Sequence, residues 1–328
     1  RSVPSSRPRT IVIGTNKKFI HFSPLNIFPL KEKIQTVRQA IGNLPSLNYG
    51  EISEDVLHFF REYPKYMEEW ISHIAEGESA FNNDEQYKPY KIENGTKVTL
   101  KGAHLGNKFR RLFWDKPGAC IATRNDQLAS QDTIHPKDNR VLSIRELMRL
   151  MTIPDEFKWS NENLSNLITK NQKLDFLKEN ELNIRRCIGE AVPTHIMQTI
   201  AKNTKEMLMF QQYVDDYYSN KTCFKGRKKS FYIQAFDYEM GLIGAKESGS
   251  YYTPQTVVFE TLSTIDLSHK NSVKILEPSV GMGAFLPQLL RLCDVCDKTV
   301  LDVCDCSDEA LTELKRIMKL IPYNKELI

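Results

Sequence analysis

Residues 275–286 constrain the fold of this chain more than any other stretch. They read I-L-E-P-S-V-G-M-G-A-F-L, so an apolar run ends in an acid and a proline and is followed by two closely spaced glycines. Glycines at the end of a strand let the backbone approach a nucleotide-like ligand without a Cβ in the way. The stretch predicts a strand, a glycine turn and a helix, which together open an α/β unit.

The neighbouring segments continue this alternation. We expect strands at 273–276 and 299–303, and helices that begin near 257, 283 and 308. An acid at the end of the second strand of such a unit accepts the ribose hydroxyls of the ligand. Asp305 holds that position, and Asp302 is the alternative, although it falls inside the strand.

Upstream of residue 257 the local signals differ in strength. Residues 10–14 read as a short buried strand, residues 51–75 have helical apolar spacing, and residues 80–140 read as strands and loops. The strongest helix signal is at 143–151, where Ser143 can cap the first turn and Glu146 stands three residues later. Shorter helices are expected at 31–41 and after Pro193.

Bulk properties bound the function only loosely. The length of 328 residues fits two domains, and a net charge of +4 permits a nucleic-acid partner without requiring one. No apolar run is long enough to span a membrane, and an odd count of seven cysteines fits a reducing cytoplasm. Four of these cysteines form C-x2-C-x7-C-x-C near the end; a zinc site and free thiols both remain open, and we predict no metal.

Three upstream motifs point to one enzyme family. They are S-R-P-R-T-I-V-I-G at 6–14, R-V-L-S-I-R-E-L-M-R-L at 140–150 and I-G-E-A-V-P at 188–193. Together they resemble the closing motifs of cytosine-5 DNA methyltransferases over residues 1–203, with Ser6 where glutamine is usual and Glu190 where asparagine is usual. The resemblance implies double-stranded DNA as the partner and base flipping as part of the reaction.

The resemblance also implies roles for individual residues. Arg9, with Arg7 beside it, matches the arginine that holds the flipped pyrimidine, so both are catalytic candidates; phosphate neutralisation is the alternative. The target-recognition region is expected at 16–139. Its base-reading candidates are Thr123, Arg124 and Asn125, and an ordinary surface loop is the alternative.

The downstream part resembles a different family. G-S-Y-Y-T-P at 249–254 and E-P-S-V-G-M-G-A-F-L at 277–286 are similar to motifs of N(6)-adenine DNA methyltransferases, over residues 237–328. The resemblance implies S-adenosyl-L-methionine as cofactor, and 204–236 would be a basic linker. The implied cofactor-binding residues are Tyr252, Thr253, Pro254, Glu277, Pro278, Gly281, Gly283, Phe285 and Asp305.

The two resemblances combine into one expectation. The fold is α/β, with partial S-adenosylmethionine-dependent methyltransferase (Rossmann-like) units and a mixed target-recognition domain. The chain is expected to be a segment of a bifunctional enzyme of a restriction-modification system, which methylates cytosine C-5 and adenine amino groups at a specific DNA site. It would supply target recognition and part of the cofactor site.

Chemistry is expected to need further parts. None of the seven cysteines follows a proline, as the nucleophile of cytosine-5 methyltransferases does, and N-P-P-Y is absent. Since the sequence also begins at Arg1, we expect a piece of a longer polypeptide, inactive alone and completed by its missing parts or by a complementing subunit. The alternatives are the recognition subunit of a split cytosine-5 methyltransferase, or a non-catalytic cofactor-binding module.

Overall fold

The computed structural model describes residues 3–14, 27–29, 33–100, 108–161, 163–219, 253, 255–267, 269–281 and 283–318. The chain divides into two compact units, and each is described by itself. The first comprises residues 1–9 and 34–196, and the second comprises residues 10–33 and 197–328.

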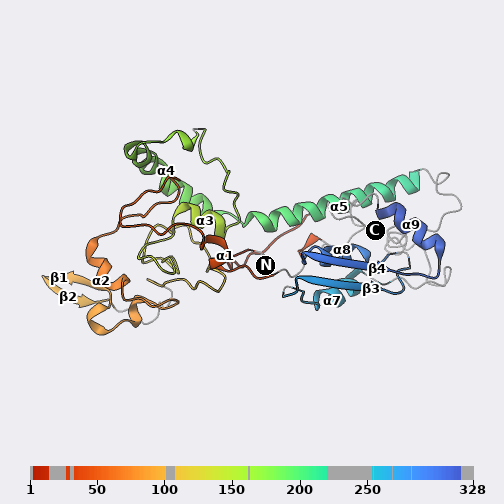
Figure 1. The fold of residues 1–328 in the computed structure, drawn as a ribbon, viewed down its shortest axis with the longest axis horizontal. Coiled ribbons are helices and arrows are strands. Elements are labelled where there is room, and N and C mark those ends of the chain that lie inside the picture. The colour runs from red at the N-terminus through yellow and green to blue at the C-terminus, as the bar shows by residue number, and fades with distance from the viewer. Residues whose placement is uncertain are drawn as a thin grey trace. The chain divides into compact units, whose positions relative to one another are not determined.

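The first unit consists largely of loops packed around short helices (Figure 1). Its elements are α1 (Val37–Ile41), α2 (Glu68–Ile71), β1 (Tyr90–Glu93), β2 (Thr96–Thr99), α3 (Ile144–Leu150) and α4 (Lys170–Glu190). Its main core gathers apolar side chains of α1, α3 and α4, including Ile41, Met148 and Ile188. A second cluster surrounds Trp70 and Ile134.

Helix α3 forms for the local reasons that its sequence predicts. The Ser143 hydroxyl accepts a hydrogen bond from Glu146 N, and the Glu146 carboxylate accepts one from Ser143 N, so the capping box is complete. Four large apolar side chains on the short helix are buried, which anchors it in the core. The helix expected at 143–151 is confirmed.

Two other expectations are wrong. Residues 10–14 form no strand, and Val12 is 90% exposed. Residues 51–64 are not helical: Ile52 and Phe59 pair in an antiparallel bridge, and helix begins only with a 3-10 turn at Lys65–Met67 followed by α2. The apolar side chains in this stretch are buried by tertiary packing rather than on one helix face.

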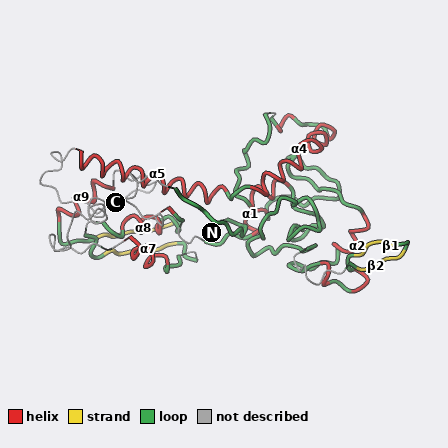
Figure 2. The backbone as a smooth tube through the Cα atoms, turned by 180° about the vertical axis from the view of Figure 1, so that it is seen from behind, coloured by secondary structure: helices red, strands yellow, loops and turns green. Residues whose placement is uncertain are grey.

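Strands β1 and β2 form an antiparallel hairpin, with Tyr90 opposite Thr99 and Glu93 opposite Thr96. The hairpin lies at the outer edge of the first unit in both views (Figure 2). The turn residues Asn94 and Gly95 both have positive φ, +50° and +78°. Such a turn follows the right-handed twist of the flanking strands and fixes their register.

The second unit contains the alternation predicted from the glycine-rich stretch. Its elements after α5 (Thr194–Ser219) are α7 (Gln255–Ser263), β3 (Ser272–Glu277), α8 (Leu286–Cys293), β4 (Lys298–Val303) and α9 (Asp308–Met318). Strands β3 and β4 are parallel, with Ile275 opposite Leu301. The predicted order of strands and helices from 257 onward is confirmed.

Side chains of α7 and α8 pack against one face of this small sheet. Val258, Leu262 and Leu289 pack with Ile275 and Leu301. The described chain is therefore a mixed structure of helices and small sheets. No described helix is long and apolar enough to cross a membrane.

Candidate functional site

The loop at residues 118–126 brings together several residues singled out in the sequence. Its first residue pairs with the N-terminal segment: Gly118 N donates to Pro4 O (2.7 Å), and Ser6 N donates to Gly118 O (2.8 Å). Arg7 Nη1 donates to the Ile121 carbonyl (2.9 Å). Arg7 therefore fixes the backbone of this loop.

The far end of the loop is held by Asn125, which is only 1% exposed. Its amide nitrogen donates to Ala122 O (2.7 Å) and to Arg185 O (2.9 Å) of α4. Its amide oxygen accepts from Arg185 Nη1 (3.1 Å). Because both ends of the amide are used and buried, this conformation gives Asn125 no access to a base edge.

A buried ionic network extends this anchor. Arg185 Nε donates to Glu181 Oε1 (2.7 Å), and the other oxygen of Glu181 accepts from Arg61. Arg61 Nε also donates to the Asp126 carbonyl (3.1 Å). The loop is thus tied to α4 and to residue 61 by charge-assisted hydrogen bonds, which are stronger than neutral ones.

Helix α4 also touches the loop directly. A Cβ placed on Gly189 would lie 2.5 Å from Thr123 Cα and 2.6 Å from the Ala122 carbonyl oxygen. Only a residue without a side chain allows this approach of helix to loop. The I-G-E-A-V element therefore contributes a contact surface for the loop.

Between these anchors, the loop exposes Thr123 and Arg124. The Arg124 side chain is 67% exposed, and its Nε donates to Asp126 Oδ1 (3.1 Å). Burial opposes ionisation of Asp126, but the hydrogen bond and charge of Arg124, a backbone hydrogen bond and the charge of Arg61 together hold the pKa of Asp126 below its ordinary value. Only the Arg124 side of this pair is exposed, since the Asp126 side chain is 6% exposed. Arg61 Nη2 also lies 3.8 Å from Asp126, so the carboxylate keeps a cationic neighbour when the Arg124 guanidinium turns to a ligand.

The structure treats the two N-terminal arginines differently. Arg7 is half-buried against the loop, whereas Arg9 is exposed and donates to the carbonyl of its neighbour Pro8 (2.8 Å). Arg7 thus joins the loop, and Arg9 does not touch it in the described structure.

A second buried network lies at the start of α3 and was missed in the sequence. Arg140 Nη1 and Nη2 donate to both oxygens of Glu146 (2.7 and 2.8 Å), and Arg140 Nε donates to Asp138 Oδ2 (3.0 Å). Burial favours a neutral Glu146, yet Arg140 lowers the pKa of Glu146 to about 2. The R-x-L-S-x-R-E pattern carried the signal, since an arginine precedes the capping glutamate by six residues.

This network makes stability depend on pH through His135. Burial lowers the pKa of His135 from 6.5 to about 4, against the opposing effect of Glu146. Between these values the unfolded chain binds a proton that the folded chain does not, so stability falls as pH falls.

We expect the free energy of unfolding, measured by urea titration, to decrease by about 2 kcal/mol between pH 6.5 and 5. His135→Asn should remove this loss, whereas the exposed His73→Asn should leave it; equal slopes in all three proteins would contradict the assignment.

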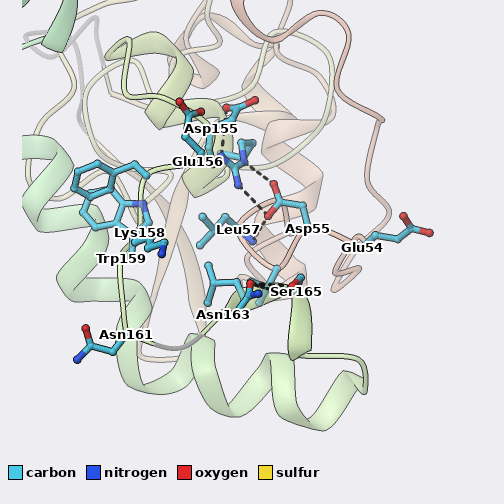
Figure 3. Close-up of a pocket in the computed structure, with 14 residues that line it drawn as sticks. Glu54, Asp55, Leu57, Asp155, Glu156, Lys158, Trp159, Asn161, Asn163 and Ser165 are labelled. Carbon is cyan, nitrogen blue, oxygen red and sulfur yellow. Dashed lines mark hydrogen bonds and ion pairs between the residues drawn. The ribbon is translucent and has the colours of Figure 1, made fainter.

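A cavity of about 440 Å³ lies beside α3, lined among others by Asp55, Asp155 and Trp159 (Figure 3). Arg145 Nε hydrogen-bonds to Asp55, and Arg145 Nη1 donates to the Asp155 backbone carbonyl (2.7 Å). The cavity brings together none of the predicted site residues. Arg145 pairs there with Asp55 and Asp155, which gives Arg145 a structural role.

The glycine turn of the second unit is closed by Asp305. Asp305 Oδ2 accepts from Gly281 N (2.7 Å), and its Oδ1 accepts from Ser307 N (2.8 Å). Gly281 and Gly283 have φ of +52° and +92°, a region that favours glycine. No atom lies within 4 Å of a Cβ placed on Gly281, so there is space beside this backbone for a ligand.

The other predicted cofactor residues are placed as follows. Glu277 ends β3 and accepts from Ser279 N (3.2 Å), with Pro278 between them. Phe285 caps α8 and packs against the core of the second unit. Thr253 is half-buried, while Tyr252 and Pro254 lie outside the described residues.

The cysteines of the C-x2-C-x7-C-x-C pattern divide between interior and surface. Cys293 and Cys296 are buried, whereas Cys304 and Cys306 are exposed. Among the described residues, no group of three or more histidine, cysteine, aspartate or glutamate side chains is arranged to hold a metal ion.

Comparison with known proteins places the first part of the chain. The profile of the family C-5 cytosine-specific DNA methylase matches residues 2–206. Type II methyltransferase M1.HgaI of Avibacterium volantium is 36% identical over 208 residues, which are 61% of this chain and 51% of that protein. Type II methylase M.HgiDII of Herpetosiphon aurantiacus is 26% identical over 210 residues, 63% and 52% of the two chains.

A third relative matches a shorter stretch of the chain. Type II methyltransferase M.AquIB of Picosynechococcus sp. is 28% identical over 119 residues, which are 36% of this chain but 78% of that protein. With M1.HgaI and M.HgiDII, in contrast, the match spans about half the length of the relative.

Proposed function

The chain belongs to the C-5 cytosine-specific DNA methylase family, and from this premise we propose that its first unit recognises the DNA target of a modification methyltransferase. The observation that carries the proposal is the 118–126 loop. Its exposed tip, Thr123 and Arg124, is held by buried anchors from the N-terminal segment, residue 61 and α4. A guanidinium on a backbone anchored in this way can donate two hydrogen bonds to the O6 and N7 atoms of guanine.

Arg124→Ala tests base reading. We expect it to remove discrimination at one base pair, worth about 1–3 kcal/mol, with a smaller effect on overall affinity. The measurement is selection of a randomised duplex pool by the full chain, followed by sequencing. Arg186→Ala, which removes another exposed arginine, here paired with Glu190, is the control. An unchanged preference in Arg124→Ala would place base reading elsewhere.

Arg9 fits a second part of this function. Its guanidinium is exposed and donates to the neighbouring Pro8 carbonyl. We propose that it contacts the target cytosine, where a positive charge favours negative charge developing on the ring. The thiolate that attacks cytosine must come from outside these seven cysteines, in another part of the enzyme or in a complementing subunit.

For the second unit we propose an S-adenosylmethionine site at the carboxyl end of β3, of the kind found in adenine-specific methyltransferases. Ligands of open α/β sheets bind at this edge. The open space beside Gly281 and the amides held by Asp305 support the proposal. The bound cofactor would supply a methyl group from its sulfonium. With DNA recognition by the first unit and cofactor binding by the second, the chain would be part of a bifunctional enzyme that methylates cytosine and adenine.

Substitution of two aspartates tests which of them accepts the ribose hydroxyls of the cofactor. Asp305→Ala removes the acceptor of two turn amides and should weaken binding of the demethylated cofactor about tenfold or more in calorimetry. Asp302→Ala, on the exposed face of β4, is the matched control and should bind within about twofold, since it loses only an exposed pair with Lys274. The reverse result would make Asp302 the ribose acceptor.

A further inference from the structure

The β1–β2 hairpin has no structural task for most of its length. Residues 91–99 are all exposed, and Ile92 is 70% exposed. The hairpin is attached at its base, where the Tyr90 ring packs edge-on against Trp70 at 5.4 Å. Figures 1 and 2 both show it projecting from the rest of the first unit. A two-stranded hairpin is marginally stable in water, and the outer edges of both strands have unpaired backbone groups. A projecting hairpin is therefore suited to contact a partner molecule.

Its charge indicates the chemistry of that partner. The hairpin, residues 90–99, contains two lysines, Lys91 and Lys97, against one acid, Glu93. Lys91 pairs with Glu93, and Lys97 lies 3.5 Å from Glu69 and 4.2 Å over the Tyr90 ring. These pairs are exposed and contribute little, so a polyanion can replace the carboxylates.

The register places Lys91 and Lys97 on opposite faces of the hairpin. Ile92 stands opposite Lys97 and shares one face with it, whereas Lys91 stands opposite Val98 and shares the other. Each face therefore presents one lysine beside one apolar side chain, and the Lys91 face also carries Glu93. The turn residue Asn94 lies at the tip between the two faces.

This arrangement matches a groove of duplex DNA. The major groove is about 12 Å wide and admits a two-stranded ribbon, with a phosphate backbone along each wall. Lysines on the two faces reach one wall each, and a tip amide meets the base edges, where asparagine can pair with adenine.

We propose that the β1–β2 hairpin enters the major groove as a second DNA-reading element, separate from the 118–126 loop. Lys91 and Lys97 bind the two phosphate backbones, and Asn94 meets the base edges. The inference rests on the proposed function, because it takes DNA as the partner of the first unit.

The first test measures binding of the full chain to duplex DNA by fluorescence anisotropy over a range of salt concentrations. The double variant Lys91→Gln/Lys97→Gln should bind more weakly, and the slope of log affinity against log salt should become shallower by about 1.8. Lys270→Gln/Lys298→Gln, two exposed lysines of the second unit, is the matched control with an unchanged slope. Circular dichroism confirms that both variants fold.

The second test concerns Asn94. Asn94→Gly keeps a turn that allows positive φ and removes the amide. It should therefore leave affinity for random DNA within about twofold and lose preference at one base pair.

If the wild type binds DNA and the lysine variant has an unchanged salt slope, the hairpin proposal is overturned, and the hairpin is left free to pair with a strand of another polypeptide. Absence of DNA binding by the wild type would instead overturn the proposed function itself.

Discussion

Glu146→Gln is expected to lower the free energy of unfolding of the first unit by about 3–5 kcal/mol. Glutamine keeps the shape of the side chain, but it removes the charge that both terminal nitrogens of Arg140 contact at 2.7 and 2.8 Å. Arg140 is fully buried, so its charge is left with Asp138 alone. Breaking one side of a buried pair leaves an uncompensated charge away from water.

Tryptophan fluorescence measures this effect selectively. All three tryptophans, Trp70, Trp114 and Trp159, lie in the first unit, so their emission in a urea titration follows unfolding of that unit. Glu156→Gln, at an exposed position, should change the free energy by no more than about 0.5 kcal/mol. A loss of less than about 1 kcal/mol in Glu146→Gln would mean that the pair contributes no more than a surface pair.

Gly189→Ala is expected to abolish base discrimination and to lower stability by about 1–3 kcal/mol. Alanine normally favours a helix over glycine by about 1 kcal/mol, so helix propensity alone predicts the opposite sign. The new methyl group, however, would lie 2.5 Å from Thr123 Cα and 2.7 Å from Thr123 N, and backbone atoms cannot rotate away. The loop must move, and Arg124 moves with it.

Gly14→Ala is the matched control, because nothing lies within 4 Å of a Cβ at that position and its φ is not left-handed. Both variants are compared with the wild type by selection from a randomised duplex pool and by urea unfolding. If Gly189→Ala were more stable and kept its base preference, the contact between α4 and the loop would not determine recognition.

Local signals predicted the elements that local interactions stabilise. The Ser143–Glu146 capping box lies within four residues and fixes the start of α3. The glycine turn after β3 follows from Gly281 and Gly283, whose positive φ suits only glycine without strain. Each feature is formed by residues that are close together in the sequence, and both features are found in the structure.

The contacts that local signals do not predict join residues far apart in the sequence. Asn125 has the right chemistry to read adenine, but its amide is used by Arg185, sixty residues away. The spacing of Glu181 and Arg185 on one helix face was the available signal for this network. Likewise, Phe59 has helical spacing with its neighbours but pairs with Ile52 in a bridge. Nothing in the local pattern of residues 51–64 predicts this bridge.

The alternation of buried and exposed residues in the 118–126 loop has a consequence for evolution. Ile121 and Asn125 are buried and hold the backbone, whereas Thr123 and Arg124 between them face solvent. Mutations at the two exposed positions leave the anchoring bonds intact, so they are nearly neutral for folding. Under the role proposed for this loop, a lineage can therefore change the DNA sequence that it recognises through single substitutions, and duplicated genes can diverge in specificity while they keep the same scaffold.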